Sequence, residues 1–169
     1  MLGIAESFKM SGSVSTLAGV VMRRDLIIDG MMFGHTTIEG DDATRSIISI
    51  YQSLARDDIS CIMINGLVLS MYNIVDGKMV ASETGIPIIA ITFEDSDGIE
   101  DSIKHHFRNW QNKLDQYQKL GPREKVLLKT GKSLFIRYWD LNQKKAIAII
   151  NSFTAKQIIH INVTNVLGS

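Results

Sequence analysis

The chain has 169 residues, which is enough for a full hydrophobic core, and we expect a single domain over residues 1–169. Hydrophobic residues make up 45% and charged residues 21% of the chain, as in a globular protein rather than a disordered one. Basic and acidic residues balance at 18 each, so net charge alone favours neither nucleic acid nor an anionic membrane as a partner. No signal peptide precedes residue 1 and no apolar run could cross a bilayer, which predicts a cytoplasmic protein without a membrane partner.

The first third of the chain predicts three strands. Leu2–Ile4 is a short apolar run that is followed by Ala5 and Glu6, so Glu6 would stand at or just past the end of a first strand. Residues 16–22 and 25–37 are rich in apolar and β-branched residues and are separated by a charged turn, which predicts an antiparallel hairpin.

The middle of the chain alternates between helical and strand patterns. The acidic residues Glu39, Asp41 and Asp42 precede apolar residues at helical spacing up to Leu54, and acids suit the first turn of a helix. We expect a helix or irregular helix within 69–85, a strand over 88–93, and one long helix from about residue 98 to Leu120.

The apolar run from Cys61 to Ile64 predicts a central parallel strand that is covered on both faces. It ends at Asn65, and Gly66 allows a sharp exit. Ligands and catalytic groups gather at the carboxyl ends of such strands, which makes Asn65 a site candidate. In the alternative interpretation, its side-chain amide caps the turn or the next helix.

The last third predicts a hairpin and a helix. Residues 125–129 and 134–139 would form the hairpin, and Asn142 could cap a helix that reaches Phe153. Residues 157–166 are rich in β-branched residues but stand at the end of the chain, so both a strand and a packing helix remain open.

This order of elements predicts an α/β protein of the ribonuclease H-like layout, with three antiparallel strands, parallel crossovers and helices on both faces of a mixed sheet. The first strand would then lie beside the central strand. That arrangement would bring Glu6, Asp41, Asp42 and Asn65 into one cleft. Nucleases on this layout use several carboxylates there to hold Mg²⁺ ions for phosphoryl transfer.

Four motifs in register resemble one known family. They are Gly-Ile-Ala-Glu-Ser-Phe at 3–8, Glu-Gly-Asp-Asp-Ala-Thr at 39–44, Ile-Asn-Gly-Leu-Val-Leu at 64–69 with Tyr-Asn-Ile-Val-Asp at 72–76, and Glu-Thr-Gly-Ile-Pro-Ile-Ile at 83–89. Together they resemble the archaeal endonuclease V-like family, also called domain of unknown function 99 and endonuclease dU. The resemblance implies a ribonuclease H-like fold and cleavage of DNA near a deaminated base with Mg²⁺ or Mn²⁺.

The resemblance also implies roles for individual residues. The acidic pair of the family's first strand falls on Ala5 and Glu6, the acids at the helix start fall on Asp41 and Asp42, and the aspartate at the end of the central strand falls on Asn65. A histidine near the C-terminus falls on His160. This carry-over implies catalytic roles for Glu6, Asp42, Asn65 and His160, and metal ligation by Glu6, Asp41 and Asp42.

Two departures from the family pattern weaken the expected metal site. Ala5 offers no ligand, and Asn65 offers a neutral amide where a carboxylate would balance the charge of the metal. One hypothesis is a divergent nuclease in which Glu6, Glu39, Asp41 and Asp42 rebuild a weak Mg²⁺ or Mn²⁺ site. The other is a catalytically inactive module that binds nucleic acid or supports assembly, including homo-oligomers.

Basic residues and His160 complete the set of candidates. Arg23 and Arg24 in the hairpin turn, and Lys125 and Lys129 in the densest basic run, could contact the phosphates of DNA, or could keep a surface hydrated. His160 lies between apolar neighbours, which favours a structural role. A catalytic role requires that its ring face Glu6 or Asp42.

Overall fold

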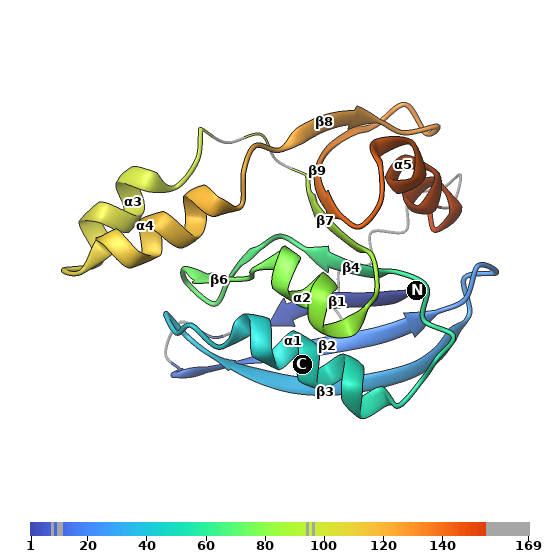
Figure 1. The fold of residues 1–169 in the computed structure, drawn as a ribbon, viewed down its shortest axis with the longest axis horizontal. Helices are drawn as coiled ribbons and strands as arrows, with labels where there is room; N and C mark the ends of the chain where they lie inside the picture. Colours follow the sequence, from blue (N-terminus) through green and yellow to red (C-terminus); the bar gives the residue numbers. More distant parts are fainter. Residues whose placement is uncertain (8, 10–11, 94, 96, 155–169) are drawn as a thin grey trace.

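The computed structural model describes residues 1–7, 9, 12–93, 95 and 97–154, and a seven-stranded sheet runs through them (Figure 1). The strands follow the spatial order β3-β2-β1-β4-β7-β9-β8. Their bounds are β1 Leu2–Ser7, β2 Val14–Met22, β3 Ile28–Thr37, β4 Ile62–Asn65, β7 Ile88–Thr92, β8 Glu124–Leu127 and β9 Ser133–Trp139.

The centre of the sheet is parallel and both flanks are antiparallel. Strand β1 pairs in parallel with β4, with Ile4 opposite Ile64, and β4 pairs in parallel with β7. Strands β2 and β3 extend one flank, and β9 and β8 extend the other, all antiparallel to their neighbours. This mixed sheet confirms the predicted layout, including the first strand beside the central one. Strands β1, β4 and β7 end at the same side of the sheet, which we call the carboxyl edge.

Helices cover both faces of the sheet, as predicted. Helices α1 (Ala43–Leu54) and α2 (Gly77–Thr84) lie on one face, over a core that includes Ile62 and Ile64. Helix α5 (Gln143–Ser152) lies on the other, over Ile89 and Ile91. Successive residues of a strand point to opposite faces, so the uninterrupted apolar runs of β4 and β7 supply both cores.

One long helix over residues 98–120 was a wrong prediction, because the chain forms two helices there. Helix α3 (Glu100–His106) ends at Phe107, whose backbone is extended at φ −108° and ψ 134°, and α4 (Trp110–Lys119) follows. The ring of Phe107 packs edge-on against Tyr72 at 5.5 Å and against His106 at 4.8 Å. These tertiary contacts accompany the break, and the two helices project to one side of the molecule (Figure 1).

Only the last part of the irregular segment predicted at 69–85 is helical, as α2. Before it, β5 (Val68–Leu69) and β6 (Asn73–Ile74) form a small antiparallel pair. Ser70, Met71 and Tyr72 join the two strands with φ angles of 41°, 55° and 70°. Left-handed backbone costs an L-residue roughly 1–2 kcal/mol. This turn therefore needs other contacts to hold it.

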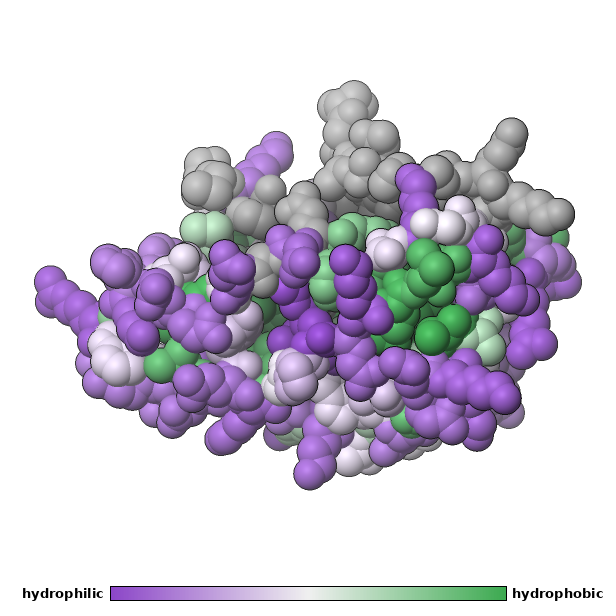
Figure 2. All heavy atoms as spheres, turned by 90° about the horizontal axis from the view of Figure 1, so that it is seen from above, coloured by the Kyte–Doolittle hydropathy of each residue, from purple (hydrophilic) through white to green (hydrophobic). Residues whose placement is uncertain are grey.

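The predicted hairpin near the C-terminal end is present as β8 and β9, and Asn142 caps α5 by accepting a hydrogen bond from the backbone N of Lys145 at 2.9 Å. Figure 2 shows hydrophilic side chains over α3 and α4, and hydrophobic side chains gathered in the half of that face where β8, β9 and α5 lie. The predictions for 157–166 and His160 fall outside the described residues. No helix in the described ranges is both long and apolar enough to cross a membrane.

A substitution at Gly77 tests how closely α2 approaches β9. A Cβ atom there would stand 2.4 Å from Cζ3 of Trp139, so Gly77→Ala should lower the free energy of unfolding by about 1–3 kcal/mol through overpacking. Gly3→Ala is the matched control, because its Cβ would meet only the carbonyl oxygen of Val20 at 3.8 Å. Urea denaturation of both variants makes the comparison, and equal stability would contradict the close contact.

Candidate functional site

The residues that were predicted to form one cleft lie where β1 and β4 end and where α1 begins. Glu6 shares a face of β1 with Leu2 and Ile4, which lie in the core beneath α1 and α2. Ala5 and Asn65 point to the opposite face by the same alternation, and Asn65 is exposed at the end of β4. The two predicted strand-end residues, Glu6 and Asn65, therefore reach the same edge of the sheet with their side chains on opposite faces.

The Glu6 carboxylate holds the first residue of the left-handed turn. Its Oε1 accepts hydrogen bonds from the hydroxyl of Ser15 at 2.6 Å and from the hydroxyl of Ser70, and its Oε2 accepts one from the backbone N of Ser70 at 2.9 Å. Both serines are 1% exposed. Glu6 thus ties the end of β1 to the segment between β5 and β6.

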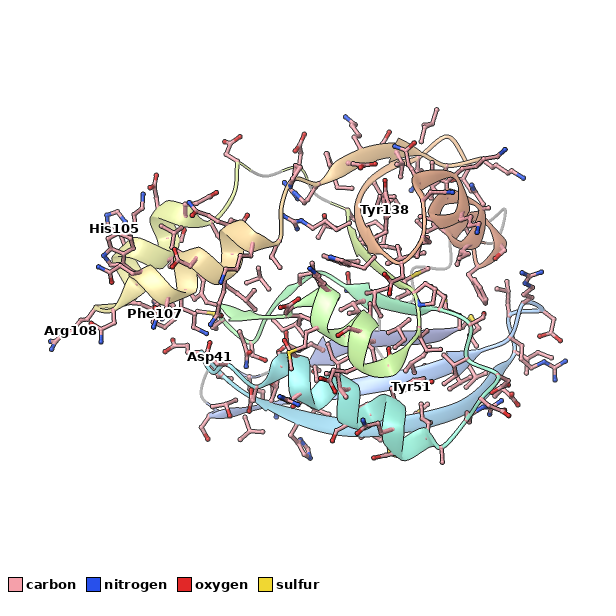
Figure 3. All side chains as sticks on the ribbon, in the orientation of Figure 1. Asp41, Tyr51, His105, Phe107, Arg108 and Tyr138 are labelled. Carbon is pink, nitrogen blue, oxygen red and sulfur yellow. The ribbon has the colours of Figure 1, made fainter. Side chains whose placement is uncertain are left out.

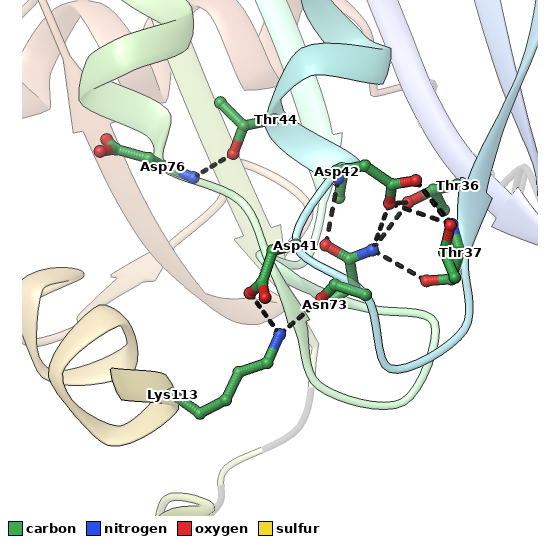
Figure 4. A network of polar contacts seen from close by, with 10 residues as sticks. Thr36, Thr37, Asp41, Asp42, Thr44, Asn73, Asp76 and Lys113 are labelled. Carbon is green, nitrogen blue, oxygen red and sulfur yellow. Dashed lines mark hydrogen bonds and ion pairs between the residues drawn. The ribbon is translucent and has the colours of Figure 1, made fainter. Parts of the chain in front are cut away.

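The Asp42 carboxylate is surrounded by donors from the end of β3 (Figure 4). Thr36 donates its hydroxyl at 2.5 Å, and Thr37 donates its hydroxyl at 2.7 Å and its backbone N at 3.0 Å. The side-chain nitrogen of Asn73 donates at 2.7 Å to Asp42 Oδ1, the oxygen that also accepts from the Thr36 hydroxyl. Both oxygens of Asp42 are therefore occupied by protein donors.

Asn73 connects this carboxylate to the first turn of α1. Its Nδ2 also donates to Thr36 Oγ1 at 2.8 Å and to the carbonyl oxygen of Thr37 at 2.9 Å. Its Oδ1 accepts from the backbone N of Ala43 at 3.1 Å, so Asn73 caps α1, whereas the side chain of Asp42 makes no capping bond. Asn73 is fully buried.

This environment changes the acidity of Asp42. Burial by itself raises the pKa of its carboxyl group, but hydrogen bonds from Thr36, Thr37 and Asn73 stabilise the charged form and outweigh it. The pKa therefore lies well below the ordinary aspartate value. Asp42 stays ionised and bonded over the whole neutral range.

The two other acids just before α1, Glu39 and Asp41, bond to side chains of α3 and α4. Lys113 of α4, whose side chain is 8% exposed, donates to Asp41 Oδ1 at 2.6 Å and also to the carbonyl oxygen of Gly40. His106 Nε2 lies 2.6 Å from Glu39 Oε1, and its ring lies 5.0 Å from that of Tyr72. Figure 3 shows Asp41 at the start of α1, with Phe107 and Arg108 at the junction of α3 and α4.

The four acids near the carboxyl edge could bind a divalent cation only if they lost their existing hydrogen bonds to protein groups. Mg²⁺ and Mn²⁺ need several oxygen ligands, preferably anionic ones, around one position. In the described part of the chain, no three His, Cys, Asp or Glu side chains converge on such a position. Glu6, Glu39, Asp41 and Asp42 bond instead to Ser, His, Lys, Thr and Asn side chains. Their role as metal ligands stays a prediction.

The predicted nucleic-acid contacts lie on separate surfaces. Arg23 and Arg24 follow the end of β2 that pairs with the start of β1, so they lie at the opposite end of the sheet from Glu6, and Arg23 pairs with Asp25 at 2.8 Å. Lys129 stands in the turn between β8 and β9, where its backbone N donates to Asn151 Oδ1 at 2.9 Å. Of the four predicted residues, Lys125 is the one whose strand position is level with the end of β7.

Sequence analysis missed an aromatic residue beside Lys125. Phe135 of β9 stands opposite both Thr92 and Lys125, and the Lys125 Nζ lies 5.6 Å from its ring centroid. The Arg123 guanidinium lies 5.0 Å from the same ring and donates to Thr92 Oγ1 at 3.3 Å. We call Thr92, Arg123, Lys125 and Phe135 the basic–aromatic row. The register of the β8–β9 hairpin places Phe135 opposite Lys125, and this pairing is the signal from which Phe135 could have been predicted.

Comparison with known proteins identifies the family. The family model described as Endonuclease dU matches residues 1–160. The chain belongs to the Endonuclease dU family. A relative from Pyrobaculum calidifontis, named UPF0215 protein, is 35% identical over 146 residues, which cover 86% of this chain and 80% of that protein. A UPF0215 protein from Pyrobaculum aerophilum is 33% identical over 142 residues, covering 83% and 76%. These matches confirm the resemblance seen in the motifs.

Solved structures share the fold of this Endonuclease dU family member. A protein of unknown function from Archaeoglobus fulgidus has a TM-score of 0.78 at 24% identity, and the match covers 93% of this chain and 87% of that one. Endonuclease V from Ciona intestinalis, in complex with DNA that contains an inosine, has a TM-score of 0.57 at 12% identity, covering 93% and 78%. At these identities, the likeness concerns the fold alone.

Replacement of Asp42 tests the carboxylate network through its pH dependence. A folded-state pKa below the ordinary value of 3.8 contributes stability that is fully present above that value and is lost as the pH falls through the folded pKa. Asp42→Asn should therefore lower the free energy of unfolding at pH 7 by about 1–3 kcal/mol. The deficit should shrink as the pH falls below 3.8, because Asp42 then takes up a proton in the unfolded chain while it stays ionised in the folded protein.

The measurement is urea unfolding at several pH values, with Asp57→Asn as the control. Asp57 is exposed in the loop before β4, and its replacement should leave stability within about 0.5 kcal/mol of the wild type. A deficit for Asp42→Asn that does not change with pH would contradict an ionised, hydrogen-bonded Asp42.

Proposed function

We propose that this Endonuclease dU family member binds DNA without cleaving it through a bound metal ion. The observation that carries the proposal is the state of the acids near the carboxyl edge. Glu6, Glu39, Asp41 and Asp42 all bond to protein groups, and the two remaining family positions carry Ala5 and Asn65. A cation there would lack the anionic ligands that hard metals require.

DNA is the proposed partner for two reasons. Endonuclease V from Ciona intestinalis, which shares the fold, is described in complex with DNA that contains an inosine. The basic–aromatic row also supplies two cations beside the end of β7, and cationic side chains provide most of the affinity for a phosphate backbone. Arg23, Arg24 and Lys129 are further proposed phosphate contacts on separate surfaces.

A second candidate function is slow cleavage of DNA with a deaminated base, supported by Mg²⁺ or Mn²⁺. Membership of the Endonuclease dU family favours it. In that case Glu6, Asp42 and His160 would carry the reaction, and His160→Ala should abolish nicking while it leaves the fold intact. A cytoplasmic location is part of both candidates and stays a prediction.

Cleavage assays separate the two candidates. We expect the wild-type protein to leave uracil-containing and hypoxanthine-containing duplexes intact with either Mg²⁺ or Mn²⁺ at neutral pH. The assay measures nicked product on a denaturing gel, with parallel binding measurements on the same duplexes. Metal-dependent nicking by the wild type, lost on chelation, would overturn the proposal.

Restoration of the two missing acids tests the proposed cause. Ala5 and Asn65 lie on the same face of adjacent strands, one residue beyond the Ile4–Ile64 pair, so Ala5→Asp with Asn65→Asp would place two carboxylates side by side. The double variant should bind Mn²⁺ measurably by calorimetry, where the wild type does not. It should also lose stability in the absence of metal, because like charges repel.

The matched control for restoration is Ala5→Asn, which adds a side chain of similar size without charge. It should not gain metal affinity. Equal Mn²⁺ binding by the control and the double variant would show that added carboxylate charge is not the cause.

The proposed DNA contact makes a separate prediction about salt. Lys125→Gln should weaken DNA binding and reduce the slope of log affinity against log salt by about 0.9, the value for one phosphate contact. Lys144→Gln is the control, because Lys144 is also exposed but lies on α5, outside the basic–aromatic row. Fluorescence anisotropy with a labelled duplex at several salt concentrations gives both slopes. Equal slopes would remove Lys125 from the interface.

A further inference from the structure

Strand β3 forms one edge of the sheet, and its middle is symmetric in sequence. Its only neighbour in the seven-stranded order of the described residues is β2. The segment Gly30-Met31-Met32-Phe33-Gly34 has glycine at both ends, large apolar residues on either side of the centre, and Met32 at the centre. Long apolar edge strands are places where other strands pair.

The two faces of this segment differ in character. Met31 and Phe33 are 45% and 52% exposed, and lie on the face of β3 away from α1. Gly30 and Gly34 alternate with them, and an added Cβ at Gly34 would stand 2.9 Å from Cδ1 of Ile50 on α1. Within residues 30–34, the exposed apolar side chains thus lie on one face of the edge.

Contacts from α1 reveal which backbone groups point outward. The hydroxyl of Ser46 donates to the carbonyl oxygen of His35 at 2.7 Å, and Ser46 and His35 both line a shallow groove beside β3. The His35 carbonyl therefore points away from β2. Hydrogen-bonding direction repeats every second residue along an antiparallel strand, so the backbone groups of Phe33 and Met31 point outward as well.

We propose that β3 pairs antiparallel with β3 of a second copy of this chain, with the two-fold axis at Met32. This register places Met31 opposite Phe33 of the second copy, and the reverse, as a pair that exchanges two backbone hydrogen bonds. Met31 and Phe33 of one copy then cover Phe33 and Met31 of the other, and a methionine sulfur meets an aromatic ring. The two sheets become one continuous sheet.

The register also suits the α1 side of the edge. Gly30 faces Gly34 of the second copy, so no side chain from that pair fills the space between the two α1 helices. Three of the five α1 residues that line the groove are small, namely Ser46, Ser49 and Ser53, and the other two are Arg45 and Ile50. The same patch is used on both copies, as a two-fold interface requires.

The opposite edge of the sheet offers no comparable segment. Strand β8 has four residues, and its sequence Glu-Lys-Val-Leu carries two charges. Charged and short edge strands resist pairing with another chain. Leu127 on β8 is nevertheless 66% exposed, which makes it a suitable position for a control substitution.

A cysteine at the two-fold axis gives the sharpest test. Met32→Cys should form a disulfide-linked dimer under mild oxidation, since directly opposed residues without mutual hydrogen bonds bring their Cα atoms to about 4.5 Å. His35→Cys is the control, because the register separates the two copies of residue 35 and should leave that variant uncrosslinked. Cys61 is buried at 1% exposure and stays outside the exchange.

Sedimentation of the full chain supplies an independent test. The wild type should sediment with twice the mass of one chain at tens of micromolar, Leu127→Lys should do the same, and Phe33→Lys and Met31→Lys should sediment as monomers with unchanged circular dichroism. A monomeric wild type, a dimeric Phe33→Lys variant, or equal crosslinking of Met32→Cys and His35→Cys would each overturn the proposal.

Discussion

The amide of Asn73 fixes the relative positions of three segments, and the arrangement of the acids depends on it. It bonds to the end of β3 through Thr36 and Thr37, to the start of α1 through Ala43, and to Asp42. Asn73, Thr36 and Ala43 are all buried, so if Asn73 were replaced, water could not readily replace its bonds to Thr36 and Ala43. The start of α1 and the direction of the Asp42 carboxylate are therefore set together.

The other acids near the carboxyl edge also join segments that are distant in sequence. Glu6 holds Ser70 at the start of three left-handed residues, and Asp41 holds Lys113 of α4. In a site with several carboxylates, a metal ion offsets their mutual repulsion. Here hydroxyl, amide and ammonium donors surround the acids, so the acids strengthen the scaffold near the carboxyl edge.

The fold was predictable where the signal was local or periodic. The apolar runs of β4 and β7 and the helical spacing of α1 led directly to the mixed sheet, and the motifs led to the family. The break at Phe107 was not predictable, since the contact that accompanies it is with Tyr72, far away in the sequence, and no glycine marks the left-handed turn at Ser70. The acids of the site were recognised, but their partners Ser70, Asn73 and Lys113 were not, because those contacts join residues 31 to 72 positions apart.

The strand order also has a consequence for synthesis on the ribosome. As the chain emerges, five strands can each pair with a strand that has already been made. They are β2 and β4, which pair with β1, and β3, β7 and β9, which pair with β2, β4 and β7 in that order. Within the seven-stranded sheet, β8 is the strand after β1 that must wait for a later strand, β9. Most residues of the core under α1 and α2 precede residue 91, whereas the core under α5 needs residues up to Ile150. Most of the core on one face of the sheet can thus be in place while the other face still awaits its helix.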